Sequence, residues 1–290
     1  MTRMRLALTS DLHVEHHPEV VALIVDRVRA IAPDVLVVAG DVSSQLATLE
    51  AALAELRRAA PRLVFVPGNH DLWMLPGTPS SRERYERAIP AACARAGVDV
   101  VGDAPIEIDG VAFVGVTGWY DYSLRNRALD ATFTLEDYRR GAWGRLRWND
   151  KLRISWPGDD GAELDDPAIC AAQVESLERQ LAAVAARPTV VVTHHLPVAE
   201  LVTSRGEPPW DFINGFMGSA RLGEAMRRAP GVRLGVCGHT HFRKRATIDG
   251  AAGEFSVETS PIGYPREYAR MGGLTLAERV ADRVTAIDLG

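Results

Sequence analysis

Five short segments of this sequence carry side chains that bind hard or borderline divalent metal ions. They are Asp11-Leu12-His13, Gly40-Asp41, Gly68-Asn69-His70-Asp71, His194-His195 and Gly238-His239-Thr240-His241. Carboxylate, carboxamide and imidazole groups suit Mn, Fe, Zn, Ni or Co ions, and no thiolate stands in these segments, which argues against a structural zinc site. Residues two apart in extended backbone point the same way, so His239 and His241 can face one ion site together, as can Asp11 and His13.

Each of these segments follows a short apolar run that reads as a buried strand. The runs are Leu6-Ala7-Leu8, Val35-Leu36-Val37-Val38, Leu63-Val64-Phe65-Val66, Val190-Val191-Val192 and Leu234-Gly235-Val236-Cys237. In open α/β sheets, ligands bind just beyond the carboxyl ends of the strands. The order of residues therefore predicts one site, rich in Asp, Asn and His, at one edge of a sheet.

Helical periodicity and turn signals fill the chain between these runs. We expect helices over 18–32, 44–60, 81–96 (interrupted or kinked at Pro90), 167–186 and 219–228. A hairpin is expected around Asp109-Gly110, and further strands over 245–248, 254–258 and 283–289. Strands that alternate with helices predict an α/β fold with parallel pairings. The candidate ligands run from Asp11 to His241, so we expect residues 1–290 to form one domain.

Residues 119–166 break this alternation. The segment is rich in Trp and Tyr, carries many charges and has weak periodicity. Two interpretations stay open: a functional lid, as long irregular segments often are, or a surface excursion whose aromatic rings pack onto the body. We expect its acidic cluster, from Asp159 to Asp166, to be solvated loop.

Composition excludes several classes of protein. The formal net charge is -5, whereas nucleic-acid-coating proteins usually carry a strongly basic face. The three cysteines form no Cys-x-x-Cys pair, so neither a disulfide framework nor a zinc ribbon is expected.

No secretory signal or membrane-spanning run stands out, and we expect a cytoplasmic protein without a membrane partner. The pattern is silent on oligomeric state.

Taken in order, the five segments resemble those of the calcineurin-like metallophosphoesterase superfamily, over the chain from the first strand to His241. The resemblance implies a four-layer αββα sandwich of two mixed β-sheets flanked by helices. It also implies two divalent transition-metal ions (Mn, Fe, Zn, Ni or Co) and a hydroxide between them as the nucleophile. Asp11, His13 and His241 would hold one ion, Asn69, His194 and His239 the other, and Asp41 would bridge both.

Other residues receive roles from the same resemblance or from their neighbourhood. His70 follows a ligand directly, so it is the candidate general acid that protonates the departing alkoxide. Asp71 would hold its imidazolium, although the alternative is a simple cap of the following turn. His195 would support a ligand or contact the substrate phosphate. Arg243 has the best claim among the candidate substrate contacts, ahead of Arg221, Arg266, Tyr264, Trp119 and Tyr120.

Two departures narrow the family. Protein phosphatases of the superfamily carry Arg where this chain has Pro67, and purple acid phosphatases carry a Tyr ligand where it has Ser44. The sequence therefore looks more like the bacterial small-molecule phosphoesterases and phosphodiesterases. We expect hydrolysis of a small or nucleotide-like phosphomono- or diester. The alternatives are a nuclease, which the net charge disfavours, and a non-catalytic scaffold, which the complete ligand set disfavours.

Overall fold

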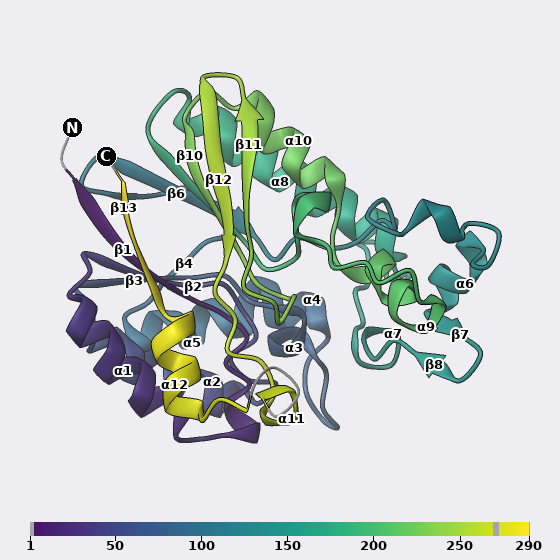
Figure 1. Cartoon of the computed structure of the whole chain (residues 1–290), viewed down its shortest axis with the longest axis horizontal. Coiled ribbons are helices and arrows are strands. Elements are labelled where there is room, and N and C mark those ends of the chain that lie inside the picture. Colours follow the sequence, from purple (N-terminus) through teal and green to yellow (C-terminus); the bar gives the residue numbers. More distant parts are fainter. Residues whose placement is uncertain (1–2, 269–272, 290) are drawn as a thin grey trace.

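Two β-sheets face each other at the centre of the computed structural model, which describes residues 3–268 and 273–289 (Figure 1). The first sheet has the order β13 (Thr285–Leu289), β1 (Met4–Thr9), β2 (Val35–Val38), β3 (Arg62–Phe65), β4 (Asp99–Val100). The second has the order β11 (Arg245–Gly250), β12 (Gly253–Thr259), β10 (Val232–Cys237), β9 (Thr189–Thr193), β6 (Val111–Val116), β5 (Ile106–Ile108). Both sheets are mixed: β13 in the first sheet and β5 and β11 in the second add antiparallel edges to parallel centres.

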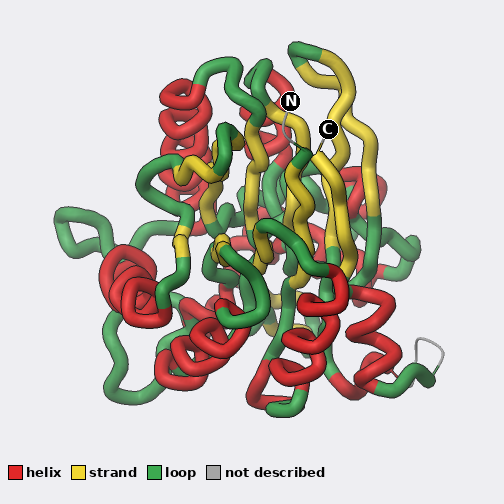
Figure 2. The backbone as a smooth tube through the Cα atoms, turned by 90° about the vertical axis from the view of Figure 1, so that its left-hand side faces the viewer, coloured by secondary structure: helices red, strands yellow, loops and turns green. Residues whose placement is uncertain are grey.

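Helices cover the outer face of each sheet (Figures 1 and 2). The first sheet is covered by α1 (Val20–Ile31), α2 (Leu46–Arg57), α5 (Ile89–Ala96) and α12 (Leu276–Arg283). The second is covered by α8 (Asp166–Val184) and α10 (Ala220–Arg228). The expected four-layer αββα arrangement is therefore confirmed.

Short elements connect the layers. The helical ones are α3 (Asn69–Leu72), α4 (Ser81–Glu83), α6 (Leu135–Arg140), α7 (Asp150–Arg153), α9 (Pro208–Asp211) and α11 (Pro265–Tyr268). The tighter 3₁₀ turns are Val14–His16, Arg127–Leu129, Ala199–Leu201 and Phe212–Phe216. The strands β7 (Ala142–Trp143) and β8 (Leu146–Arg147) form a small hairpin of their own.

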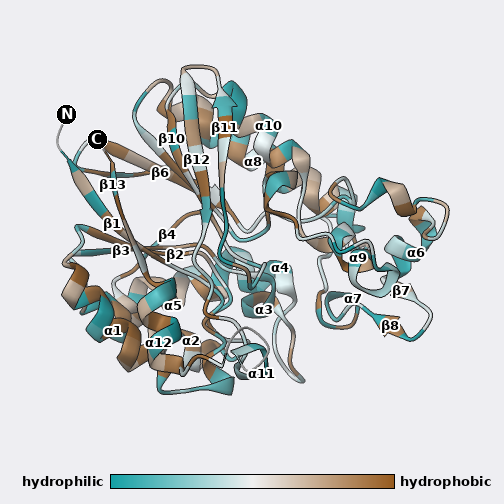
Figure 3. Cartoon of the chain, viewed as in Figure 1, coloured by the Kyte–Doolittle hydropathy of each residue, from teal (hydrophilic) through white to brown (hydrophobic). Residues whose placement is uncertain are grey.

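Period-two alternation along the strands divides the core into two parts. Leu6 and Leu8 of β1 point between the sheets, where they join a cluster that includes Phe113 of β6. Ala7, between them in the chain, belongs to the second cluster, which packs the sheets against the helices. Because both faces of the central strands are buried, these strands read as continuous apolar runs (brown in Figure 3).

The structure confirms the hairpin at Asp109-Gly110 and the interruption at Pro90, and it corrects the chain end. A π-helical turn, Arg84–Ala88, precedes Pro90, because proline supplies no N–H and its ring crowds the preceding turn. The strand expected over 283–289 begins at Thr285, since Arg283 still closes helix α12.

Residues 119–166, with α6, β7, β8 and α7, form a lobe beside the two-sheet body (right in Figure 1). We call it the 119–166 lobe. The expectation of a fully solvated acidic cluster is wrong for Asp166, which is buried. Its carboxylate accepts hydrogen bonds from Trp119 Nε1 at 3.1 Å, from the Tyr122 hydroxyl and from Lys151 Nζ. The rings of Trp119 and Tyr122 are buried too, so this end of the lobe is packed into the body.

Within the described residues, we find no helix that combines the length and the apolar character needed to cross a bilayer.

Candidate metal centre

The candidate ligands meet because five strands end at the same place. Strands β1, β2 and β3 are parallel neighbours in one sheet, and β9 and β10 are parallel neighbours in the other. The two sheets touch here, since the backbone N–H of Ser10 donates to Ser260 O at 3.0 Å. Ser10 also forms an isolated parallel β-bridge with Pro261. The loops beyond the five carboxyl ends therefore surround one small volume.

Glycine lets two of these loops come close enough. A Cβ on Gly40, whose φ is +86°, would lie 2.5 Å from His194 Nδ1. A Cβ on Gly68 would lie 2.2 Å from Asp41 Oδ1. These contacts explain why Gly precedes Asp41 and Asn69.

Four candidate ligands have left-handed backbone, which non-glycine residues seldom adopt. They are Asp11, His13, Asp41 and His239, with φ between 45° and 66°. Such conformations cost free energy that the surrounding structure must offset, and they gather at functional sites.

The first ligand group is Asp11, His13 and His241. The Nε2 atoms of His13 and His241 lie 3.2 Å apart, and His241 Nε2 lies 3.5 Å from Asp11 Oδ1. The ligand atoms of the three side chains lie close enough together to hold one metal ion, and these are the residues that the resemblance assigned to the first ion.

The second group is Asn69, His194 and His239. Asn69 Oδ1 lies 3.0 Å from His194 Nε2 and 3.1 Å from His239 Nδ1, and the two nitrogens lie 3.2 Å apart. The family resemblance assigned these three residues to the second ion.

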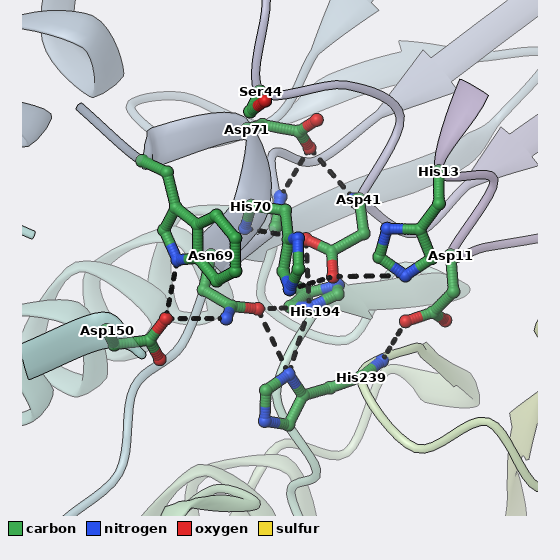
Figure 4. A network of polar contacts seen from close by, with 12 residues as sticks. Asp11, His13, Asp41, Ser44, Asn69, His70, Asp71, Asp150, His194 and His239 are labelled. Atoms are coloured by element: carbon green, nitrogen blue, oxygen red, sulfur yellow. Dashed lines mark hydrogen bonds and ion pairs between the residues drawn. The ribbon is translucent and has the colours of Figure 1, made fainter. Parts of the chain in front are cut away.

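Asp41 lies between the two groups (Figure 4). Its Oδ1 is 3.4 Å from His194 Nε2, and its Oδ2 is 3.9 Å from His13 Nε2. One carboxylate oxygen therefore faces each group, which is the arrangement that a bridging ligand requires.

The residues fit two divalent ions. Ligands that bind one ion at about 2.1 Å lie about 3 Å from one another, and the separations within each group match this value. Imidazole nitrogens, an amide oxygen and carboxylates are suitable donors for a transition metal.

Further contacts hold the ligands in orientation, as partners of metal-bound histidines do. His194 Nδ1 lies 2.9 Å from Ala39 O, and His239 Nε2 lies 3.2 Å from Phe216 O. His241 Nδ1 lies 2.7 Å from Glu267 Oε2, a partner that no sequence signal revealed.

Asp150 of the 119–166 lobe orients the amide of Asn69. Its Oδ1 accepts from Asn69 Nδ2 at 2.9 Å and from Trp73 Nε1 at 2.6 Å, and its Oδ2 accepts from Trp148 Nε1 at 2.9 Å. With the Asn69 nitrogen bound in this way, the Asn69 oxygen faces the ion site. Burial raises the pKa of Asp150, and the hydrogen bonds from Asn69 and Trp73 oppose that shift.

Two neighbouring hollows, which share several lining residues, open beside the centre. One, of about 630 Å³, is lined on the side of the first ion site by His13 and His16. The other, of about 260 Å³, is lined by ligands of both sites. Residues common to both linings are His70, Trp73, Asn149, Tyr264 and Arg266.

The sequence matches the calcineurin-like phosphoesterase family over residues 4–243. The chain belongs to this family. It is a metal-dependent phosphoric ester hydrolase, and the family uses two divalent ions at the kind of centre described above.

Known proteins of similar sequence and fold belong with this family assignment. The acyl-carrier-protein phosphodiesterase PptH of Mycobacterium tuberculosis is 26% identical over 248 residues, which cover 82% of this chain and 71% of that protein. The solved structure of phosphopantetheinyl hydrolase PptH from the same organism superposes with a TM-score of 0.68 at 24% identity, over 93% of each chain. The protein TT1561 of Thermus thermophilus shares the fold, with a TM-score of 0.54 at 13% identity over 99% of each chain.

In this phosphoesterase, His70 stands outside the two ligand groups, and its ring nitrogen lies close to ligand atoms of His13 and Asp41. Its Nε2 lies 4.0 Å from Asp41 Oδ2 and 3.3 Å from the Tyr264 hydroxyl. Its ring stacks on Trp73 with centroids 3.6 Å apart, and its side chain is 19% exposed. Burial lowers the pKa of His70, and the negative charge of Asp41 opposes that shift.

Asp71 has a different place from the one expected. Its Oδ2 accepts from the backbone N–H groups of Asp41 at 2.9 Å and Gly68 at 2.8 Å, and its Oδ1 accepts from those of Val42 and Ser43, each at 2.8 Å. The expected contact with the His70 imidazole is therefore wrong, because backbone donors already occupy both oxygens. Asp71 joins the loop of Asp41 to the loop of Asn69.

The expectation for Arg243 needs correction, and that for His195 narrows to one of its two alternatives. Arg243 has no claim as a substrate contact, because its guanidinium donates to Asp282, 3.1 Å away, and lines neither hollow. Of the two roles predicted for His195, contact with substrate does not fit its burial, whereas support of a ligand does. Its ring packs 4.4 Å from that of His239 and 5.0 Å from that of Trp119.

Proposed function

We propose that this chain is a phosphodiesterase whose two-ion centre, built on Asp41, cleaves a diester held across the two hollows. The main observation behind this proposal is that His70 and Tyr264 line both hollows. A diester has two organic groups on phosphorus and needs room for each, whereas a monoester needs room for one. The printed name of the Mycobacterium tuberculosis relative, a phosphodiesterase, supports the same class.

The ligand set prepares the centre for an anionic ester. When bound, two divalent ions would supply positive charge toward the phosphoryl oxygens and lower the pKa of a water between them. The carboxylates of Asp11 and Asp41 leave part of that charge uncompensated. Asn69, His194 and His239 are held by partners outside the centre, so little reorganisation is needed as the reaction proceeds.

His70 supplies the proton that the leaving group needs. In the reaction, a P–O bond forms from water, the P–O bond to one organic group breaks, and the products are a phosphomonoester and an alcohol. The departing oxygen takes the proton of His70 Nε2, and the Tyr264 hydroxyl at 3.3 Å and the stacked Trp73 ring position that imidazole.

For the substrate, we propose a diester that joins a small arm to a larger alcohol, as in phosphopantetheine attached to a carrier protein. The relative acts, by its printed name, on acyl carrier protein. The larger hollow offers about 630 Å³, a volume in the range of small-molecule sites.

The test compares His70→Asn with wild type on diesters whose leaving groups differ in basicity. An alkyl leaving group should lose roughly 100-fold or more in kcat, whereas p-nitrophenolate, which needs no proton, should lose less than about tenfold. Wild type should prefer bis(p-nitrophenyl) phosphate to p-nitrophenyl phosphate. Equal losses for both leaving groups would contradict the acid role, and a preference for the monoester would contradict the diester assignment.

A further inference from the structure

The hollows open onto arginines that the proposed chemistry does not use. Arg153 and Arg266 line the larger hollow, and Arg147 and Arg266 line the smaller one. All three arginines are exposed. Among the described residues, no carboxylate lies within ion-pair distance of them, whereas Arg139 and Arg140 of the same lobe pair with Glu136 and Asp137.

Aromatic rings of the site hold two of these arginines in place. The Arg153 guanidinium lies 5.3 Å from the centre of the Trp73 ring, which itself stacks on His70. The Arg266 guanidinium lies 4.8 Å from the centre of the Tyr264 ring, which stacks on His13. Cation–π contacts of this kind restrict a guanidinium without neutralising its charge. Two fixed positive charges therefore stand directly outside the reacting centre.

The basic surface extends beyond the hollows. Arg145, in the turn between β7 and β8, is exposed and lies two residues from Arg147, yet it lines neither hollow. Leu152 of α7 is 75% exposed beside Arg153. The other large apolar side chain exposed in the described chain is Leu135 of α6, also in the lobe. A small substrate inside the hollows would leave Arg145 and Leu152 without a role.

We propose that Arg145, Arg147, Leu152, Arg153 and Arg266, which we call the arginine rim, form a docking surface for an acidic carrier protein that presents its phosphodiester-linked arm to the centre. The inference rests on the proposed phosphodiesterase function and names the partner of the same site.

Charge complementarity supports this occupant. The whole chain has a formal net charge of -5, so the rim is a local positive area on an acidic protein. Such an area attracts an acidic partner and orients it as it approaches. One carboxylate, that of Glu15, lines the larger hollow. It accepts hydrogen bonds from Ser43 and Ser44 and does not pair with the arginines, so their positive charge stays available to a partner.

A folded protein fits the rim better than nucleic acid does. Tight binding of nucleic acid needs many cationic contacts with phosphates, and the rim offers four arginines around an exposed leucine. A mixed surface of cations and one apolar side chain matches a protein face with acidic residues around an apolar position.

The rim is fixed relative to the chemistry. Helix α7 begins with Asp150, whose carboxylate holds Asn69 and Trp73 of the metal centre. A partner that docks on Leu152 and Arg153 would therefore be held at a constant distance from the two ion sites.

The experiment uses the metallated full chain and three substrates: acyl carrier protein with its phosphopantetheine arm, bis(p-nitrophenyl) phosphate, and a single-stranded oligonucleotide. The variants are Arg145→Glu, Leu152→Ser and their combination. Arg58→Glu on the far end of α2 controls for the charge change, and Leu135→Ser controls for the loss of an exposed leucine. Melting temperatures check that each variant is folded.

The variants should raise KM for the carrier protein about tenfold or more and leave the rate on bis(p-nitrophenyl) phosphate within about twofold of wild type. High salt should raise the wild-type KM for the carrier protein, and Arg145→Glu should weaken that dependence. Both control variants should behave as wild type does.

Other outcomes overturn the proposal. These are an unchanged KM for the carrier protein, equal losses on the carrier protein and the aryl diester, or a rim-dependent activity confined to the oligonucleotide. A chain that cleaves the aryl diester but not the carrier-linked arm would refute the docking surface and leave the phosphodiesterase proposal standing. A metallated chain inert toward the aryl diester would refute the phosphodiesterase proposal itself.

Discussion

Asp41 and Asp150 are both buried carboxylates at the metal centre, but they come from different kinds of structure. Asp41 stands in a loop directly beyond strand β2, in register with the other ligand-bearing loops. Asp150 opens a four-residue helix in the 119–166 lobe and reaches the centre only because the lobe packs against Asn69 and Trp73.

The difference separates two ways of building a site. The motif loops contribute ligands, and parallel strands within each sheet, together with the contact between the two sheets, bring those ligands together. The lobe contributes orientation and an outer surface, and both depend on contacts between segments far apart in the chain. If this division is correct, substitutions in the motif loops should abolish binding of the two ions, whereas substitutions in the lobe should only weaken it.

The largest effect should come from Asp41→Ala. Loss of the carboxylate that faces both ligand groups should abolish stable binding of two ions and lower activity roughly 1,000-fold or more, because an ion contributes several kcal/mol to transition-state stabilisation. Elemental analysis of the purified variant and its rate on bis(p-nitrophenyl) phosphate measure the two losses. A variant that keeps two ions would show that Asp41 does not bridge them.

Asp71→Asn should chiefly cost stability. An amide can accept hydrogen bonds through only one atom, so some of the four backbone N–H groups now bound to Asp71 would lose their partner. We expect a loss of about 2 kcal/mol in the free energy of unfolding, measured by urea denaturation of the metal-free protein. An unchanged midpoint would mean that the motif loops hold together without Asp71.

Asp150→Asn tests what the 119–166 lobe contributes to metal binding. Asparagine has one accepting oxygen, so its amide nitrogen would face either Trp148 or the pair Asn69 and Trp73, and the hold on the Asn69 amide would weaken. Metal affinity should fall about 10- to 100-fold, as for other partners of metal ligands, while both ions still bind at high concentration. Asp160→Asn, an exposed change in the same lobe, is the matched control and should leave the titration unchanged.

The smallest effect should come from Glu267→Gln. A glutamine oxygen can still accept from His241 Nδ1, so the imidazole keeps its orientation and loses only the support of a full negative charge. The side chain of Glu267 is also 25% exposed, which weakens that support. Metal affinity should fall by about tenfold or less. A loss larger than that of Asp150→Asn would show that the charge of Glu267 matters more to metal binding than the hydrogen bonds of Asp150.

Much of the architecture was readable before the structure was known. The apolar runs, the Asp109-Gly110 turn and the interruption at Pro90 carry local signals, because strand burial, turn geometry and the missing proline N–H act within a few residues. The failures were non-local. The end of α12 was taken for strand, and the ring-orienting role of Asp71 was inferred from its place beside His70, where backbone donors in fact occupy both oxygens.

The sequence by itself predicted that these Asp, Asn and His side chains would gather at one edge, because a residue placed directly after a buried strand has its position set by the sheet, and the family resemblance divided them into two candidate ligand groups. The sequence also determined the family, since the order of the five segments is a property of the chain. Only the tertiary structure revealed Asp150, Glu267 and the arginine rim. These depend on how the lobe and α11 pack against the centre, and no spacing along the chain encodes a contact between residues 69 and 150 or between residues 241 and 267.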